Sequence, residues 1–155
     1  MSLHSLAMLI GCGLIAFSNP PAAAAPVQAA QAPDAARAAI SRTIGSYFQG
    51  HATGDPVHFR KAFLPTAHIE GIRDGIFTSW TLDAYCALFE GSPAPDEATR
   101  KRTIDLIDIS GNSAIARATL DHGATVFTDY FLLLKVDGEW WIANKVYSGR
   151  PAGKG

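Results

Sequence analysis

The feature that most constrains the fold is a long β-hairpin signal close to the C-terminus. Residues 125–136 and 139–147 are two stretches rich in β-branched, aromatic and aliphatic side chains, and Asp137-Gly138 lies between them. An Asp-Gly pair in this position favours a two-residue hairpin turn. Such a turn pairs Val136 with Glu139, and the pairing then predicts which side chains share a face of the sheet.

The predicted register divides this hairpin into two faces. One face carries Asp129, Phe131, Leu133, Lys135, Trp140, Ile142, Asn144 and Val146. The other carries Tyr130, Leu132, Leu134, Trp141, Ala143, Lys145 and Tyr147. Both faces are largely apolar, and monomers rarely leave a large apolar patch in water. We expect one face to cover helices and the other to form a homodimer, or else to be covered by a linker or C-terminal segment.

Shorter signals place three helices and a hairpin ahead of the final strands. Asp34 begins a helix with apolar residues at helical spacing, and Asp55-Pro56 begins a short second helix. Asp74-Gly75 turns a hairpin between 68–72 and 76–80, and Thr81 or Ser79 caps a third helix that ends at Gly91. Strands are predicted over 102–109 and 114–120. The fold class is therefore α+β, with three helices on one face of a curved antiparallel sheet.

Length and charge narrow the classes of function. The 155 residues fit one domain, with 48% hydrophobic residues and a formal charge of -1. This balance does not favour a nucleic acid or an anionic membrane as a partner. The histidines are scattered, without a pair at i,i+4 or a cysteine partner, so neither a metal site nor a cofactor is predicted.

The N-terminus predicts export to the periplasm or the outside of the cell. An apolar run from Leu6 to Phe17 precedes the small residues 22–25, so we predict a signal peptide over 1–25 and no membrane association after its cleavage. The alternative is a wrongly assigned start followed by an Ala-rich tail. A flexible linker is expected over 26–33, a domain over 34–149 and a disordered tail over 150–155. Cys12 lies in the signal peptide, and Cys86 is expected in the core.

The order and spacing of several segments resemble the nuclear transport factor 2-like superfamily, and most closely its group described as putative lumazine-binding proteins. The segments are Ile44 to Gly50, Gly54-Asp55, Phe59 to Ala67, Asp74-Gly75, Ser110 to Ala114, Phe127 to Phe131 and Lys135 to Tyr147. The resemblance implies a cone-shaped roll, in which the curved sheet wraps three helices around a cavity. Fold analogy alone does not assign a function.

A cavity of this kind would have one carboxylate on the face that carries Phe131 and Trp140. We expect Asp129 to act there as a general base, since burial raises the pKa of a carboxyl group. The alternative is that Asp129 bonds a backbone group or an arginine. The residues expected to bind a ligand are Tyr47, Phe63, His68, Trp80, Tyr85, Phe131, Trp140 and Asn144.

Three hypotheses follow for the function. The first is an exported protein that binds a small planar or hydrophobic molecule in an apolar aromatic cavity. The second is an acid-base enzyme, of the isomerase, cyclase or dehydratase type, that uses Asp129 on a small hydrophobic carbonyl compound. The third is a non-catalytic interaction module, whose cone would be filled by its own side chains.

Overall fold

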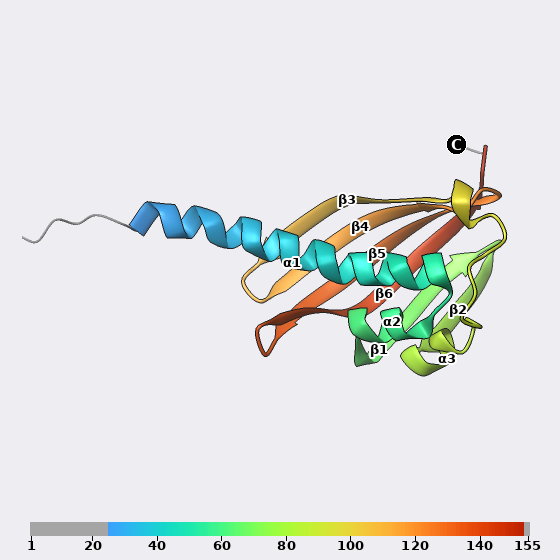
Figure 1. Cartoon of the computed structure of the whole chain (residues 1–155), viewed down its shortest axis with the longest axis horizontal. Helices are drawn as coiled ribbons and strands as arrows, with labels where there is room; N and C mark the ends of the chain where they lie inside the picture. The colour runs from blue at the N-terminus through green and yellow to red at the C-terminus, as the bar shows by residue number, and fades with distance from the viewer. Residues whose placement is uncertain (1–24, 154–155) are drawn as a thin grey trace, which may run out of the picture.

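The structure is a computed structural model that describes residues 25–153 (Figure 1). The predicted signal peptide, with Cys12, lies outside the described residues except for Ala25. Three helices pack on one face of a curved six-stranded sheet, as the sequence predicts. Among the described residues, no helix is long and apolar enough to cross a membrane.

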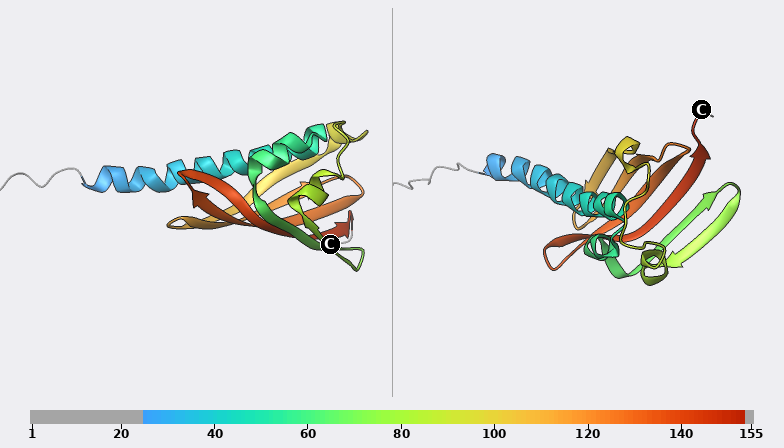
Figure 2. Two further views of the ribbon diagram at one scale, coloured as in Figure 1. Left: turned by 90° about the horizontal axis from the view of Figure 1, so that it is seen from below. Right: turned by 45° about the vertical axis from the view of Figure 1, so that its right-hand side comes forward.

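The first helix, α1, spans Ala25–Thr53 and is longer than predicted. Its first turns extend past the tips of the sheet hairpins (Figures 1 and 2). The expected linker over 26–33 is therefore wrong, because these residues are helical. The segment is rich in Ala and Gln, which are strong helix formers, and Pro26 falls in the first turn, where proline is tolerated.

The two other helices are short. α2 spans Pro56–Ala62, with the Asp55 side chain accepting a hydrogen bond from the Val57 amide and Pro56 at the first helical position. Gly54 joins it to α1 at a φ of +67°, where a Cβ would collide with the carbonyl of Ser92. α3 spans Leu82–Cys86 and is capped by Thr81, so it ends well before the predicted stop at Gly91.

The sheet has the strand order β2-β1-β6-β5-β4-β3 and is mostly antiparallel. The strands are β1 (Phe63–Arg73), β2 (Ile76–Thr81), β3 (Lys101–Ser110), β4 (Ser113–Asp121), β5 (Thr125–Val136) and β6 (Glu139–Pro151). β1 and β6 pair in parallel, which joins the early hairpin to the late strands. β6 continues along β5 to Pro151, so the first two residues of the expected disordered tail are in the sheet.

The register of the last hairpin is as predicted near its turn and wrong beyond it. Val136 pairs with Glu139, and Leu133 pairs with Ile142. A β-bulge then leaves Ala143 without a partner on β5, so Leu132 pairs with Asn144 and Asp129 with Tyr147. One extra residue in a strand reverses the facing of every later side chain. Lys145 therefore faces the helices, whereas Asn144 faces outward.

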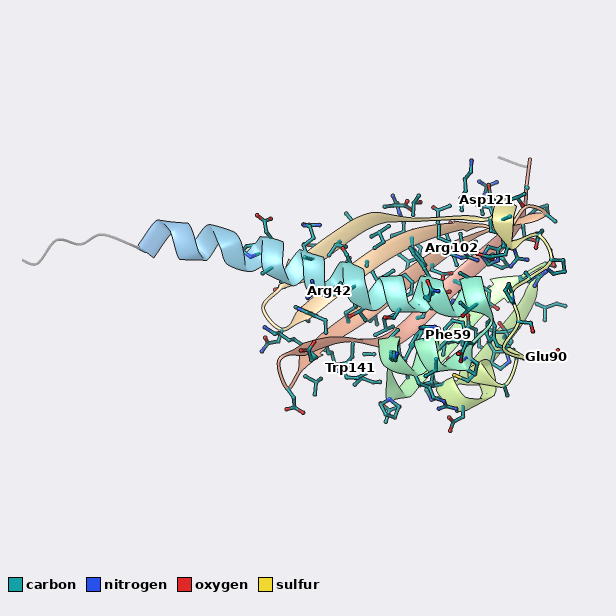
Figure 3. All side chains as sticks on the ribbon, viewed as in Figure 1. Arg42, Phe59, Glu90, Arg102, Asp121 and Trp141 are labelled. Atoms are coloured by element: carbon teal, nitrogen blue, oxygen red, sulfur yellow. The ribbon has the colours of Figure 1, made fainter. Side chains whose placement is uncertain are left out.

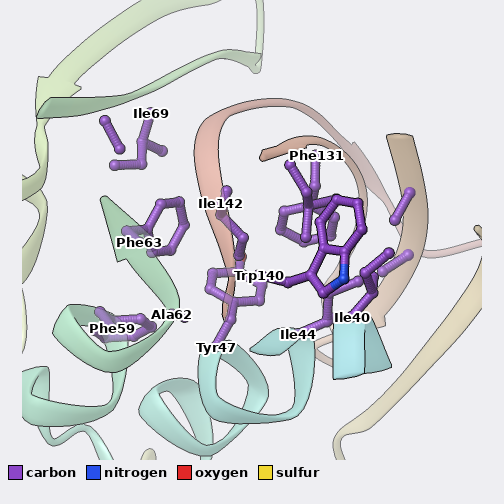
Figure 4. Packing of buried hydrophobic residues seen from close by; sticks show 14 of the residues in the cluster. Ile40, Ile44, Tyr47, Phe59, Ala62, Phe63, Ile69, Phe131, Trp140 and Ile142 are labelled. Carbon is purple, nitrogen blue, oxygen red and sulfur yellow. The ribbon is translucent and has the colours of Figure 1, made fainter. Parts of the chain in front are cut away.

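The core lies between α1 and the concave face of the sheet. Ile40, Ile44 and Tyr47 recur at helical spacing and are fully or almost fully buried against Phe131 and the strands around it (Figure 4). The Thr43 hydroxyl also donates a 2.8 Å hydrogen bond to the Trp140 carbonyl. These contacts hold the second half of α1 over the sheet and place Tyr47 at its centre.

Candidate functional site

A cavity of about 630 Å³ opens between the end of α1, α3 and the concave face of the sheet. Ala116 and Ala118 of β4 face the same side of the sheet but are packed in the core beside the cavity. The residues that line the cavity are Tyr47, His51, Arg73, Thr78, Trp80, Tyr85, Leu88, Phe89, Asp96, Arg100, Leu120, His122, Ala124, Thr125, Phe127, Asp129, Lys145 and Tyr147. It therefore combines aromatic walls with polar and charged groups.

Three bonded polar side chains form the floor of the cavity. The Lys145 ammonium donates to the Tyr47 hydroxyl at 2.8 Å and to Asp129 Oδ2 at 3.1 Å. Tyr47 in turn donates to the same carboxylate oxygen at 2.5 Å. Lys145 and Asp129 are 4% and 1% exposed, so this is a buried ion pair. We call these three residues the polar floor.

Burial and neighbouring charges change the pKa values of two residues of the polar floor, Lys145 and Tyr47. Burial lowers the pKa of Lys145, and the Asp129 charge opposes that change. Burial, followed by the Asp129 charge, raises the pKa of Tyr47 well above its usual range. Tyr47 is therefore a hydrogen-bond donor at neutral pH. The aromatic rings of Tyr47, Tyr85 and Tyr147 lie 4.9, 5.5 and 4.8 Å from the Lys145 nitrogen, which is cation-π distance.

Two histidines also line the cavity, and the His51 ring lies 4.8 Å from the ring of Tyr47. His51 Nε2 is 3.0 Å from the Tyr85 hydroxyl, and the His51 ring is 5.4 Å from the ring of His122. Burial, and then the Lys145 charge, lowers the pKa of His51 well below its usual value. Burial, followed by the charges of Arg100 and Arg102, lowers the pKa of His122 to about 4. Both imidazoles are neutral at pH 7 and can accept a proton.

A stacked aromatic pair forms the wall beside β1 and β2. The rings of Trp80 and Tyr147 are stacked at 6.3 Å with an interplanar angle of 8°. The Tyr147 hydroxyl is 2.6 Å from the hydroxyl of Thr78. Gly71 makes this arrangement possible, because a Cβ there would lie 2.4 Å from the Tyr147 ring. The wall thus offers a flat surface on which a planar molecule can stack.

Ion pairs hold the loop at the mouth of the cavity. Arg102 of β3, labelled in Figure 3, binds both carboxylate oxygens of Glu97 at 2.6 and 2.8 Å. Arg100 pairs with Asp96 at 2.8 Å, and both side chains line the mouth. His122 Nε2 is also buried there, and no described residue bonds it. It is therefore free to bond a molecule that enters the cavity.

The structure brings together four of the nine residues that the sequence singled out. Tyr47, Trp80, Tyr85 and Asp129 line the cavity. Three others, Phe63, Phe131 and Trp140, are core residues with at most 4% exposure. The remaining two, His68 and Asn144, are exposed on the outer face, where the His68 amide donates to the Asn144 side chain at 2.8 Å. Asn144 was assigned to the cavity through the register that the bulge reverses.

Sequence reasoning missed several residues of the cavity. Lys145 and Tyr147 were assigned to the outer face by the same register error. His51 lies in the last turn of α1 and His122 directly follows β4, and no paired spacing in the sequence singles out either histidine. The available signal was Lys145 itself, a lone charge between apolar strand residues, which suggests either an exposed edge or a buried partner. In the part of the chain that the structure describes, no group of three or more potential metal ligands occurs.

Comparison with known proteins identifies the family. A family model described as putative lumazine-binding matches residues 35–148. The chain belongs to this family. A nuclear transport factor 2-like protein of unknown function from Shewanella baltica is 30% identical, with a TM-score of 0.65 over 84% of this chain and 100% of that one. A second such protein, from Silicibacter pomeroyi, is 24% identical, with a TM-score of 0.69 over 76% and 98% of the two chains.

A curated relative has a named activity. The aldolase FrzH of Cladobotryum sp is 24% identical over 115 residues, which are 73% of this chain and 90% of that protein. Together the comparisons show the nuclear transport factor 2-like superfamily and its putative lumazine-binding group, as the sequence resemblance implies.

Proposed function

We propose that the protein binds a small, flat, largely apolar molecule in the inner cavity, with its polar groups directed to the polar floor. The observation that carries this proposal is the combination of a hollow of about 630 Å³, a stacked aromatic wall and a buried hydrogen-bonding cluster. Small-molecule sites have this composition. The hollow also favours a ligand over the interaction-module hypothesis, which expects the cone to be filled.

Ligand binding can be tested with flat bicyclic compounds. Lumazine, which the family description names, and naphthalene-type rings should raise the melting temperature and quench tryptophan fluorescence. Trp80→Ala should weaken binding about fivefold, because a lost stacking contact is worth on the order of 1 kcal/mol. Trp141→Ala is the matched control, since Trp141 does not line this cavity. Equal losses in the two variants, or no binding by the parent protein, would contradict the proposal.

A second candidate function is acid-base catalysis on a small carbonyl compound. It is favoured by Asp129 and Tyr47 of the polar floor and by the neutral His51, whose ring lies 4.8 Å from the ring of Tyr47. The similarity to an aldolase supports the same class, because an aldol reaction removes a proton from the carbon next to a carbonyl group. In this role Tyr47 would donate a hydrogen bond to the carbonyl oxygen, and Asp129 or His51 would take the proton.

Proton exchange tests this second function without knowledge of the natural substrate. A cyclic ketone such as 2-tetralone, in D₂O, should exchange its α-hydrogens faster with the protein than without it, as followed by NMR. Asp129→Asn and His51→Gln should each slow this exchange by about 100-fold if the group is the base. His68→Gln, which changes an exposed residue, should not. Unchanged exchange in both cavity variants would sink the catalytic proposal.

We further propose that the protein is exported and forms a homodimer through the outer face of the sheet. Export rests on the apolar N-terminal run and the small residues after it. The dimer rests on a group of half-exposed apolar side chains that the outer face carries. This outer patch consists of Leu106, Ile115, Tyr130, Leu132, Leu134 and Val146. The periplasm or the extracellular space is the proposed location, with a small molecule as the partner.

A further inference from the structure

Lys145 is the one amine in the described part of the chain that is buried in the cavity. The chain has five lysines, at positions 61, 101, 135, 145 and 154. Three of the others, Lys61, Lys101 and Lys135, are exposed. Lys145 is 4% exposed and still lines the cavity, so its nitrogen can meet a molecule bound there.

The geometry around this nitrogen leaves one N–H without a polar partner. An ammonium group has three donors, and Lys145 uses two of them on Tyr47 and Asp129. Among the residues that the structure describes, the third finds no oxygen or nitrogen acceptor, and three tyrosine rings surround the group instead. If the pair only stabilised the fold, a third acceptor would be expected in so buried a site.

Asp129 and Tyr47, the hydrogen-bond partners of Lys145, are also the groups that Lys145 would need to form a covalent bond with a ligand. Asp129 Oδ2, at 3.1 Å, can take the proton that converts the ammonium into a nucleophilic amine. The Tyr47 hydroxyl, at 2.8 Å from the nitrogen, can donate to an oxygen that develops beside it. A desolvated lysine with such partners is the usual form of an amine nucleophile. Burial, which lowers the pKa of Lys145, acts in the same direction.

We propose that Lys145 forms a Schiff base with an aldehyde or ketone group of the molecule bound in the cavity. This deepens the proposed function and rests on it, since the cavity must first hold a carbonyl compound. Asp129 takes one proton from the ammonium, and the amine adds to the carbonyl carbon while Tyr47 donates its proton to the carbonyl oxygen. The second proton then passes from nitrogen to Tyr47, which gives a neutral carbinolamine. The C–O bond breaks as Asp129 returns its proton to the hydroxyl, water leaves, and an iminium with one N–H remains on Lys145. No oxidant or reductant is needed.

The chemistry also defines the ligand class. The carbonyl carbon must reach Nζ at the floor while the rest of the molecule lies along Trp80 and Tyr147, so the ligand is an aromatic or flat cyclic aldehyde or ketone. Within the polar floor, the charges of Lys145 and Asp129 already neutralise each other. A ligand without a net charge is therefore favoured.

Reductive trapping tests the proposal on the full chain. The protein is incubated with 2-naphthaldehyde at a limiting concentration, then with sodium borohydride, and the modified lysine is mapped by mass spectrometry. We expect the adduct on Lys145 to exceed that on Lys61, Lys101 or Lys135 by about tenfold, because the cavity holds the aldehyde beside Lys145 and Asp129 and Tyr47 lie within hydrogen-bond distance of its nitrogen. Lys135→Met should leave the adduct on Lys145 unchanged. An adduct only on the exposed lysines or the α-amino group would overturn the inference.

The same experiment separates this inference from the proposal that the cavity binds ligands. 2-Naphthalenemethanol has the same ring system and no carbonyl group, so it should quench tryptophan fluorescence without forming an adduct. Quenching by the alcohol with no aldehyde adduct on Lys145 would leave the binding site intact and remove the Schiff base. Lys145→Met should lose the adduct, and the double variant Lys145→Met/Asp129→Asn provides a folded protein if the single variant does not fold.

Discussion

At the scale of the residue, the buried ion pair between Lys145 and Asp129 makes the loss of either partner alone costly. Lys145→Met leaves a buried carboxylate that keeps only Tyr47 as a partner, and such a charge costs about 3–5 kcal/mol. Changing Asp129→Asn in the same chain removes the uncompensated charge. We expect the double variant to be more stable than Lys145→Met alone, as measured by the free energy of unfolding in urea. A double variant at least as unstable as the sum of both singles would show that the pair is not coupled.

At the same scale, His122 makes the free energy of unfolding depend on pH. Its pKa in the folded protein is about 4, whereas an imidazole in the unfolded chain titrates near 6.5. Between these values the unfolded chain binds more protons, so the free energy of unfolding falls as the pH is lowered from about 6.5 to 4. His51, with its pKa also lowered, acts in the same direction. The contribution of the half-buried His122 should be on the order of 1–2 kcal/mol after solvent screening.

Substitution of His122 isolates this effect. His122→Gln should flatten the loss of stability between about pH 6.5 and 4, as measured by urea unfolding at a series of pH values. The charged groups that face the ring, on Asp96, Glu97, Arg100 and Arg102, are unchanged in this variant. His68→Gln is the control, because His68 is exposed on the outer face. Parallel curves for the parent protein and His122→Gln would refute the assignment.

At the scale of the element, the sequence predicted most of the helices and strands. It assigned the β6 side chains beyond Ala143 to the wrong faces of the sheet. Caps and turns such as Asp55-Pro56, Asp74-Gly75 and Thr81 act over a few residues, so they can be read locally. The bulge at Ala143 has no such local sign, because both faces of β6 are apolar and alternation does not reveal a missing pair. The error moved Lys145 out of the site and Asn144 into it. It could be corrected only through contacts with Tyr47 and Asp129, which lie far away in the sequence.

The bulge predicts opposite outcomes for two deletions in β6. Asn144 already lies opposite Leu132, and Ile142 lies opposite Leu133. Deletion of Ala143 therefore leaves Lys145 facing the cavity, and we expect a folded protein that still binds a naphthalene-type ligand. Deletion of both Ala143 and Asn144 instead places Lys145 opposite Leu132, which faces outward, so binding should be lost. Both variants are checked by melting temperature and tryptophan quenching. Lost binding in the single deletion together with retained binding in the double deletion would contradict the role of the bulge.

At the scale of the whole molecule, the two faces of the sheet have different surroundings. The concave face is covered by α1 and encloses the polar floor. The convex face carries the outer patch, in which Leu132 is 55% and Tyr130 49% exposed. Monomers rarely expose apolar side chains in such a contiguous group. A two-fold dimer would bring the patch against its own copy and bury it.

The variant Leu132→Glu tests whether the outer patch forms this dimer. Leu132 lies on β5, a central strand, between Ile115 of β4 and Asn144 of β6, so in a two-fold contact the new carboxylates of both copies would approach one another in an apolar setting. We expect light scattering after size exclusion to show a dimer for the parent protein and a monomer for this variant. Val57→Glu makes the same change at a residue of α2 that is 43% exposed, and it should remain dimeric. If the parent protein is monomeric at micromolar concentration, or if both variants dissociate equally, the outer patch is not the interface. Because Lys145 and Asp129 face away from this patch, a monomeric Leu132→Glu protein should still bind its ligand in the cavity.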